Sequence, residues 1–381
     1  MRNSLRIAYI SEMRMPTERA HGIQIMRTCE SLSTSGSIVK LFYSNRKQSN
    51  LSLKNSNPYK YFGIEKNFQI QPVFFIDVLS IEKFIKPFLT PLMFISNLIF
   101  ALTIPIVSRS WKPDIYYTRH WLSALVLSIT GNTVIFELHR AGSHEFSKRA
   151  LKIIKLTTKI SKNIFITTIS NELKNNLIDI GVEKNKIEVL PDALPNKSKN
   201  ITNQQFDVLY TGHLVKGRGV ETIIESSKNL PKINFTIIGG NEKDRKILIN
   251  KYKPDKNVEF IKHLSPAKIQ DYQTRAKILV LPQTDIHGQS PLKLFEYIAA
   301  KRPIIATNLA PIKEILENNY TALLFSPGNH IELTECISKL ISDQKLGKYL
   351  SKNATEKYKD WTWENRSLKI IKIITDKIGI N

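Results

Sequence analysis

Residues 283–307, QTDIHGQSPLKLFEYIAAKRPIIAT, combine a polar loop, a short helix, a proline break and a buried strand. Ser290 is a good N-cap and Pro291 fits the first helical position, which predicts that a helix begins there. Lys293 is a cation in the first turn, where it opposes the helix dipole unless an anion also binds there. Glu296 follows one turn later on the same face. A helix N-terminus with a lysine for phosphate and a glutamate for sugar hydroxyls suits a nucleotide-sugar.

These residues also have ordinary explanations, which stay open at this point. Lys293 and Glu296 could form a surface ion pair, and Arg218 lies in a glycine-rich turn, GHLVKGRG, that could simply be solvated. That turn fails as a P-loop, because its second glycine is followed by Arg-Gly. The chain contains no Asp-x-Asp pair, so a leaving diphosphate would be stabilised by cations and the helix start. We therefore expect no metal and no bound cofactor, with the nucleotide-sugar as a co-substrate.

The rest of the chain alternates short apolar runs with helical patterns, which predicts parallel sheets covered by helices on both faces. Strands are expected at residues 6–10, 38–43, 114–117, 133–138, 164–168 and 187–190, and then at 206–210, 234–238, 258–261, 278–281, 304–306 and 322–325. The polar run 196–205 interrupts this pattern and is interpreted as a linker. We expect an N-terminal domain at 1–195, a second domain at 206–360 and a C-terminal helix in 361–381.

The composition is that of a globular protein, with 42% hydrophobic and 23% charged residues in a chain long enough for two domains. The formal net charge of +23 favours an acidic partner such as nucleic acid, anionic lipid or an acidic glycan, but a lysine-rich composition that keeps the protein soluble explains it as well. No nucleic-acid recognition motif occurs, so we expect no such partner. Cys29 and Cys336 match no metal or redox spacing, and no signal peptide precedes the first strand, so a cytoplasmic location is expected.

Two segments raise the question of a membrane. Residues 87–108 contain no charged residue and are long enough for a span, but two prolines and two polar residues interrupt them. We favour a buried or interface-lying helix over contact with a membrane surface, and such contact over a true span. Residues 146–162 form a basic amphipathic pattern with lysines at helical spacing, which is either a solvated face or a surface for anionic lipid.

Several motifs occur in a fixed order along the chain. They are RAHGIQIMRTCESLSTSG near the start, PDIYYTRHW, VIFELH, ITTISNELKNNL followed by VLPDAL, FDVLYTGHLVKGRGVETII, and SPLKLFEYIAAKRPIIAT. Over nearly the whole chain this arrangement resembles the GT-B-fold glycosyltransferases of family 4, the "group 1" retaining transferases, and the last motif is the most specific. The resemblance implies an α/β fold of two doubly wound, Rossmann-like domains facing a cleft, with the C-terminal helix returning to the N-terminal domain.

The resemblance also implies roles for donor-binding residues. Glu296 matches the glutamate that hydrogen-bonds the donor ribose, and Lys293 and Arg218 match positions near the donor diphosphate. His213 stands where the family usually has arginine. Gly288 lies where many members carry a second glutamate, so Asp285 or His287 would take its place or the sugar is held differently. The implied donor-binding set is Gly212, His213, Arg218, Gly288, Gln289, Ser290, Pro291, Leu292, Lys293 and Glu296.

On the acceptor side, His139 matches a histidine near the reactive carbon of the sugar and is the catalytic candidate. It could instead be a satisfied histidine at a strand end. Gly22 matches a glycine that lets a loop approach the diphosphate, and Arg19 and His21 beside it are candidates for binding acceptor or phosphate.

The implied function is transfer of a sugar from a nucleotide-sugar to a lipid-linked or polysaccharide acceptor, with retention, in cell-surface glycan or lipopolysaccharide synthesis. The departing phosphate would help deprotonate the acceptor, without an enzyme nucleophile. The expected place is the cytoplasm, at the inner face of the plasma membrane, with peripheral contact to anionic lipid. The alternatives are a GT-B-fold sugar-nucleotide epimerase and an inactive nucleotide-sugar-binding protein, which Gly288 motivates.

Overall fold

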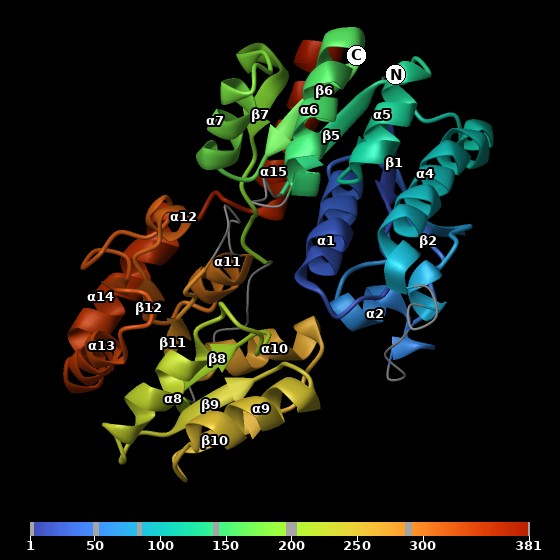
Figure 1. Ribbon diagram of the computed structural model, residues 1–381. Helices are drawn as coiled ribbons and strands as arrows, with labels where there is room; N and C mark the ends of the chain where they lie inside the picture. Colours follow the sequence, from blue (N-terminus) through green and yellow to red (C-terminus); the bar gives the residue numbers. More distant parts are fainter. Residues whose placement is uncertain are drawn as a thin grey trace. The chain divides into compact units, whose positions relative to one another are not determined.

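The computed structural model describes residues 4–48, 53–81, 86–139, 145–195, 204–285 and 292–379 (Figure 1). The chain divides into two compact units, one made of Met1–Pro191 and Trp363–Asn381, the other of Asp192–Thr362. We call them the N-terminal and the C-terminal unit. The expected linker at 196–205 lies outside the described residues up to residue 203.

The N-terminal unit contains a seven-stranded parallel sheet in the order β3-β2-β1-β4-β5-β6-β7. Its strands are β1 (Arg6–Ser11), β2 (Ile38–Ser44), β3 (Gln69–Val73), β4 (Ile115–Thr118), β5 (Val134–Leu138), β6 (Ile164–Thr168) and β7 (Ile187–Val189). Its helices are α1 (Ala20–Thr34), α2 (Pro58–Phe62), α4 (Leu89–Ser108), α5 (Trp121–Ile129), α6 (Glu145–Ile160), α7 (Asn171–Asp179) and α15 (Trp363–Ile378).

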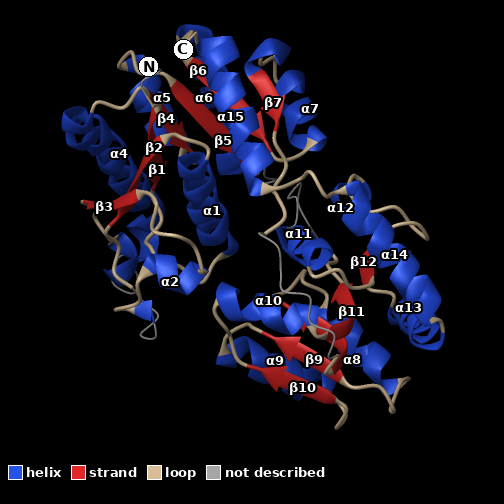
Figure 2. Ribbon diagram, turned by 180° about the vertical axis from the view of Figure 1, so that it is seen from behind, coloured by secondary structure: helices blue, strands red, loops and turns tan. Residues whose placement is uncertain are grey.

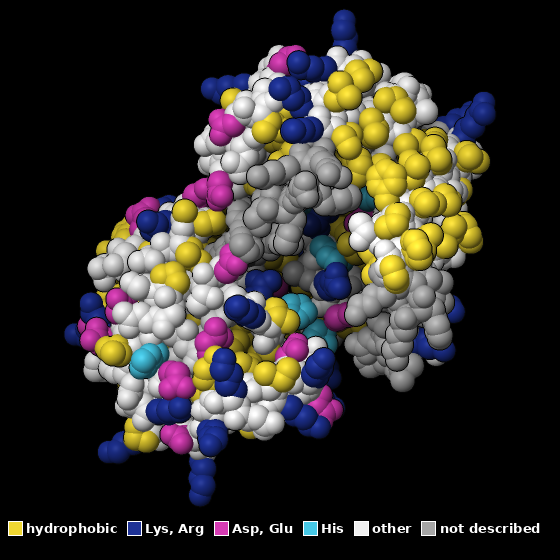
Figure 3. Space-filling model, in the orientation of Figure 1, with side chains coloured by type: hydrophobic (Ala, Val, Ile, Leu, Met, Phe, Trp, Pro, Cys, Tyr) yellow, Lys and Arg dark blue, Asp and Glu magenta, His cyan; other side chains and the backbone are white. Residues whose placement is uncertain are grey.

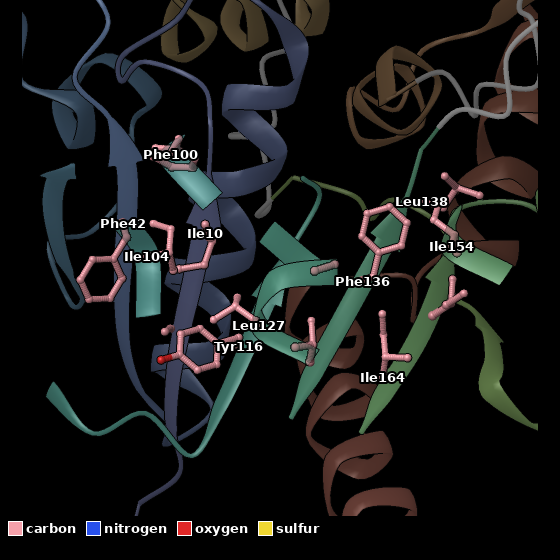
Figure 4. Close-up of a cluster of buried hydrophobic side chains, with 14 of the residues drawn as sticks. Ile10, Phe42, Phe100, Ile104, Tyr116, Leu127, Phe136, Leu138, Ile154 and Ile164 are labelled. Atoms are coloured by element: carbon pink, nitrogen blue, oxygen red, sulfur yellow. The ribbon is translucent and has the colours of Figure 1, made fainter. Parts of the chain in front are cut away.

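Successive residues of a strand face opposite sides of a sheet, so each strand of this unit serves two cores. Ile7 of β1 belongs to a core with α1, α2 and α15, whereas Ile10 belongs to a second core with α4, α5, α6 and α7. Figure 4 shows the second core, to which α4 contributes Phe100 and Ile104. Helices therefore cover both faces of the sheet, as the apolar strand pattern predicts (Figure 2).

The last helix, α15, follows the C-terminal unit in sequence but packs on the N-terminal one. Its residues Ile370 and Ile374 are fully buried in the core beneath α1. The Ser31 hydroxyl of α1 donates to the Trp363 carbonyl at 2.6 Å. The predicted return of the C-terminal helix to the N-terminal domain is confirmed.

The C-terminal unit contains a six-stranded parallel sheet in the order β10-β9-β8-β11-β12-β13. Its strands are β8 (Phe206–Thr211), β9 (Phe235–Ile238), β10 (Val258–Ile261), β11 (Ala276–Leu281), β12 (Ile304–Thr307) and β13 (Leu323–Phe325). Its helices are α8 (Val220–Lys228), α9 (Glu242–Tyr252), α10 (Pro266–Thr274), α11 (Leu292–Ala299), α12 (Ala310–Lys313), α13 (His330–Ser342) and α14 (Gln344–Lys357). The predicted doubly wound fold of both domains is confirmed.

The predicted strands all occur, with ends that shift by one or two residues. The sequence missed β3, whose five residues QIQPV include two glutamines and a proline. This strand lies at the edge of its sheet, where proline is tolerated and one side needs no partner.

The apolar segment 87–108 forms α4, a helix that is long and apolar enough to cross a membrane by length and composition. The expectation of a buried or interface-lying helix is met by a helix that is buried on one face only, since 22% of its 18-residue apolar window is buried. The basic amphipathic pattern at 146–162 forms α6, as predicted.

Candidate active site

Both sheets change winding direction between their first strand and their fourth. In the N-terminal unit this switch point lies between β1 and β4, and in the C-terminal unit between β8 and β11. Ligands of doubly wound folds bind outside the carboxyl ends of the strands at such points, because loops there diverge and leave a crevice. The candidate residues are therefore described around these two points.

The N-terminal unit has a cavity of about 240 Å³ at its switch point. Three neighbouring strand ends contribute to its wall. Ser11 is the last residue of β1, and Arg119 and His139 come directly after β4 and β5. Trp121, Leu151 and Ile154 line its apolar side. The polar lining consists of Ser11, Glu12, His21, Arg119, Glu137 and His139.

At the base of this cavity lies Glu137, a fully buried carboxylate in the middle of β5. Its oxygens accept hydrogen bonds from Arg366 Nη2 at 2.8 Å and Gln24 Nε2 at 2.5 Å, and also from the Tyr117 hydroxyl and His139 Nε2. Such a charge is tolerated inside a protein only when donors and an opposite charge replace its water. The carboxylate therefore fixes groups from β4, β5, α1 and α15 around one point.

This network sets the protonation of the cavity. Burial alone would raise the pKa of Glu137, but the charge of Arg366 and the contact with His139 outweigh it and hold that pKa well below its ordinary value. Burial and the positive charge of Arg119 lower the pKa of His139 to about 4, although Glu137 acts in the opposite direction. At neutral pH His139 is thus uncharged: its Nε2–H donates to Glu137, and Nδ1 remains an acceptor.

The other acceptor-side candidates differ in position. His21 lines the cavity; burial and Arg119 lower its pKa to about 4, and its buried Nε2 has no hydrogen-bond partner among the described residues. Gly22 is buried, and a β-carbon there would lie 2.5 Å from the Thr17 side chain and 2.8 Å from that of Phe62. Gly22 therefore has a packing reason for its lack of a side chain. Arg19 is exposed and is not among the residues that line the cavity.

In the C-terminal unit the turn after β8 lies against the segment that follows β11. The Gly217 carbonyl accepts hydrogen bonds from the amides of Thr284 at 3.1 Å and Asp285 at 3.3 Å. Gly219 has a φ of +70°, and a β-carbon there would lie 1.7 Å from the Pro282 carbonyl oxygen. Only glycine can occupy that position, because the turn approaches the neighbouring backbone too closely for any side chain.

This turn carries three of the expected donor-binding residues. The Arg218 backbone amide donates to the Val215 carbonyl at 3.2 Å, while its side chain is partly exposed and makes no hydrogen bond or ion pair with a described residue. Gly212 and His213 are also partly exposed, and the His213 carbonyl accepts a 2.8 Å hydrogen bond from the Tyr210 hydroxyl. Arg218 is thus a cation at the switch point whose guanidinium is available to an anion.

The first turn of α11 holds the other donor-side pair. Lys293 Nζ donates to Glu296 Oε2 at 3.0 Å, and Gln273 Nε2 of α10 donates to the same oxygen at 3.1 Å. Gln273 also donates to Thr211 Oγ1 at the end of β8, at 3.0 Å. Glu296 is thereby tied to the strand end, while its Oε1 has no partner among the described residues. Lys293 therefore forms the ion pair with Glu296 and also remains a candidate for binding an anion.

Several donor-side expectations lie outside the described residues. These are the Ser290 cap, the helix start at Pro291, and the loop residues Gly288 and Gln289. Leu292 is the first described residue of α11 and is partly buried. Among the described residues, no group of three or more histidines, cysteines, aspartates or glutamates is arranged to hold a metal.

The sequence missed several residues that build the N-terminal cavity. Glu137 lies within the expected strand 133–138, and a lone acid in the apolar run VIFEL is unusual for a buried strand, which is the signal that marks it. Gln24 and Arg119 carried no such signal. Arg366 lies 229 residues from its partner Glu137, so no local pattern could have joined them.

The two doubly wound units define a GT-B fold. Comparisons with known proteins show similarity to glycosyltransferases. Residues 195–357 match the family model of group 1 glycosyl transferases. The chain is 28% identical over 222 residues to an uncharacterized glycosyltransferase of Methanocaldococcus jannaschii, covering 57% of this chain and 60% of that one. These matches confirm the resemblance to the group 1 glycosyltransferases.

Two further relatives have informative names. The capsular polysaccharide biosynthesis glycosyltransferase CapM of Staphylococcus aureus is 24% identical over 55% of this chain and 57% of its own length. The N,N'-diacetylbacillosaminyl-diphospho-undecaprenol alpha-1,3-N-acetylgalactosaminyltransferase of Campylobacter jejuni is 25% identical over 54% of this chain and 57% of its own. The chain thus spans somewhat more than half the length of these curated relatives.

Among solved structures, HepE of Anabaena in complex with UDP-glucose has a TM-score of 0.73 to this chain. The alignment covers 97% of this chain and 99% of that one at 13% sequence identity. A likeness at this identity shows the shared fold.

Proposed function

We propose that this protein transfers a sugar from a nucleotide-sugar to a polysaccharide or lipid-linked acceptor, with retention of the anomeric configuration and without a metal. One observation carries the proposal: Lys293 and Glu296 stand in the first turns of α11, tied to the end of β8, inside the region that matches the family model. This is the switch point of the C-terminal sheet, where a nucleotide is expected in such a fold.

On the donor side, the two charges of that pair have separate tasks. Glu296 Oε1 accepts hydrogen bonds from ribose hydroxyls, while Gln273 holds Oε2 in place. Lys293 leaves Glu296 and contacts the diphosphate, whose negative charge grows as the bond to the sugar breaks. Arg218 supplies a second cation from the turn after β8. Stabilisation of the leaving group accelerates transfer because these charges act most strongly in the transition state.

On the acceptor side, the cavity of the N-terminal unit provides orientation rather than a nucleophile. Uncharged His139, held by Glu137, offers Nδ1 to a hydroxyl of the sugar or acceptor, and His21 offers a second acceptor nitrogen. In the proposed step the acceptor oxygen bonds to the anomeric carbon as the carbon–phosphate-oxygen bond breaks. The proton of the acceptor hydroxyl passes to the departing phosphate on the same face.

The names of two relatives suggest the acceptor. CapM belongs to capsular polysaccharide biosynthesis, and the Campylobacter relative acts on a sugar carried by diphospho-undecaprenol. We therefore infer a growing cell-surface glycan, free or attached to a lipid, and a cytoplasmic enzyme at the inner face of the plasma membrane.

A thermal-shift screen against nucleotide-sugars tests the donor site, because a ligand that binds the native state raises the melting temperature. UDP-glucose is the first probe, since HepE was crystallised with it. Glu296→Ala should weaken binding of the responding donor by about 1–3 kcal/mol through a lost charged hydrogen bond. Glu314→Ala, which removes an exposed acid of the same unit, is the matched control. Equal donor affinity in both variants would refute the site.

Product analysis separates transfer from the other chemistries of this fold. Incubation with donor alone should leave the sugar unchanged, and an epimerised sugar would overturn the proposal. Incubation with donor and lipid-linked or glycan acceptors should give a new glycoside with the donor's anomeric configuration. Donor binding without turnover on any acceptor of the panel would instead support an inactive binding protein.

A further inference from the structure

An apolar surface covers the outer side of α4 in the N-terminal unit. Phe94, Leu102 and Ile106 are 40%, 50% and 75% exposed. Leu102 lies eight residues after Phe94 and seven after exposed Ile95, and Ile106 lies four residues further on, so all four side chains share one side of the helix. Figure 3 shows hydrophobic side chains gathered over this side of the unit. Four large apolar side chains gathered on one face of a helix differ from singly scattered exposed residues and mark a binding surface.

Four polar side chains of α4 donate hydrogen bonds to backbone carbonyls of the protein. Asn97 donates to the Met93 carbonyl at 2.7 Å and Thr103 to the Ile99 carbonyl at 2.8 Å, each one turn back along the helix. Ser108 donates to the Ile104 carbonyl at 2.7 Å, and Ser96 to the carbonyl of Ile76 at 2.5 Å. These four donors are satisfied without water, which lowers the cost of bringing this part of the helix into an apolar medium.

The opposite face of α4 is fixed in the protein core. Phe100, Ala101 and Ile104 are fully buried, and the first and last of these pack on the sheet (Figure 4). A helix that crossed a bilayer would have to leave this core and expose it to water. The helix therefore lies along a surface, with about 30 Å of length for its 20 residues.

Positive charge accompanies the apolar surface. α4 packs on α5, and α5 packs on α6. On α6, exposed Lys152 and Lys159 alternate with exposed Leu156 and Ile160. No aspartate or glutamate occurs in α4, in α5 or in residues 151–160 of α6. Apolar side chains beside lysines without acids match the interface of an anionic bilayer, where acyl chains lie below negative headgroups.

The same elements reach the cavity. Trp121, the first residue of α5, lines the cavity and contacts Phe94 of α4, with ring centroids 6.4 Å apart. Ile154 of α6 also lines the cavity from the inner side of its helix. A lipid carrier lying along α4 would thus have its headgroup next to the cavity wall.

From this arrangement we infer that the N-terminal unit docks on an anionic lipid bilayer through the outer faces of α4 and α6, without spanning it. The apolar side chains of α4 insert among the acyl chains, and the lysines of α6 contact the headgroups. The docking itself stands on the exposed surface; its use in presenting a lipid-linked acceptor rests on the proposed function.

Vesicle flotation of the full chain tests the docking. Wild-type protein should float with vesicles of phosphatidylcholine and phosphatidylglycerol, and alkaline carbonate should release it. Leu102→Gln and Ile106→Gln should each weaken flotation about tenfold, because each removes one inserted side chain. Ile331→Gln, a change of the same type at an exposed isoleucine of α13, should float like the wild type. Wild-type protein that stays unbound, or resists carbonate, would overturn the inference.

The lysines give a second, independent test. Lys152→Gln and Lys159→Gln should each weaken binding to the anionic vesicles about fivefold and leave binding to pure phosphatidylcholine unchanged. Equal loss on both vesicles, or none, would contradict the headgroup contact. Sedimentation of the free protein completes the set: a dimer that Ile106→Gln dissociates would assign the surface to a second copy instead.

Donor binding distinguishes this inference from the proposed function. The α4 and α6 variants should keep the thermal shift with the donor, since the donor residues lie in the other unit. If vesicles fail to bind while the donor still does, only the docking is refuted. If vesicles bind but no nucleotide-sugar does, only the proposed function is refuted.

Discussion

The two units place their candidate residues at equivalent points of equivalent sheets but hold them by different means. In the N-terminal unit, the buried carboxylate of Glu137 accepts hydrogen bonds from four side chains of distant segments, Arg366, Gln24, Tyr117 and His139. In the C-terminal unit, close backbone contacts hold the turn after β8, and the charged pair on α11 is partly exposed. The first site is preorganised; the second keeps charges that can exchange partners.

The largest effect is expected at Glu137. Replacing it by glutamine would leave the Arg366 guanidinium buried without its counter-charge, which costs about 3–5 kcal/mol of folding stability. The double variant Glu137→Gln/Arg366→Met should recover part of this loss, because it removes both charges. Denaturant unfolding of the full chain measures the free energy of unfolding of the single and the double variant. If the single variant loses less than about 1 kcal/mol of folding stability, Arg366 does not depend on the charge of Glu137.

The C-terminal unit should respond most strongly at Gly219. Alanine there meets both a positive φ and a backbone carbonyl at 1.7 Å, so a loss of at least about 3 kcal/mol is expected. Gly328→Ala is the matched control, with a φ of +78° and no atom within 4 Å of the added carbon. That variant should lose about 1 kcal/mol, the cost of the backbone conformation alone. Equal losses in the two variants would show that the turn at Gly219 can shift away from the Pro282 carbonyl.

A smaller effect is expected from acidification. Burial and Arg119 lower the pKa of His21 to about 4 in the folded protein, from an ordinary value of 6.5. The unfolded chain therefore binds the proton first, and stability is lost as the pH falls from 6.5 towards 4. The loss for this residue is about 3 kcal/mol once the pH has fallen through that window. His21→Gln should flatten the dependence of unfolding free energy on pH, and an unchanged slope would contradict the burial of its ring.

The smallest effect on stability is expected at Lys293. Its ion pair with Glu296 is partly exposed, so Lys293→Ala should change unfolding free energy by less than about 1 kcal/mol. Donor turnover should fall at least about tenfold, because a charge that stabilises the leaving diphosphate is missing. Steady-state kinetics measures the effect on turnover, and denaturant unfolding measures the effect on stability. A variant that loses stability but keeps its turnover would show that the pair serves the fold.

Local patterns predicted much of this molecule. Apolar runs of four to six residues located the strands, since buried parallel strands need apolar residues on both sides. The edge strand β3 was not predicted because two of its five residues are glutamine and one is proline. Composition located α4, but which face is buried depends on contacts such as that between Phe100 and Phe75, whose ring centroids lie 5.7 Å apart, and such contacts are not local.

The sites were predicted less evenly. Glu296 and Lys293 lie in one helix, so their spacing alone placed them together. Gln273, which orients Glu296, comes from α10 and had no sequence signal. In the N-terminal unit His139 was a candidate, but the groups that set its charge, Glu137, Arg119 and Arg366, were not. They meet only because parallel strands end at one edge and the last helix returns there.

The return of α15 has a consequence for how the chain is made. Residues up to Pro191 leave the ribosome long before Trp363, yet Glu137 obtains its guanidinium, and Ile25 its neighbour Ile370, only from that late segment. The first unit to be synthesised is therefore the last to be completed. Nascent chains halted before Trp363 should hold all seven strands of the sheet but lack the guanidinium that pairs with Glu137, and should be cut by proteases that the released protein resists.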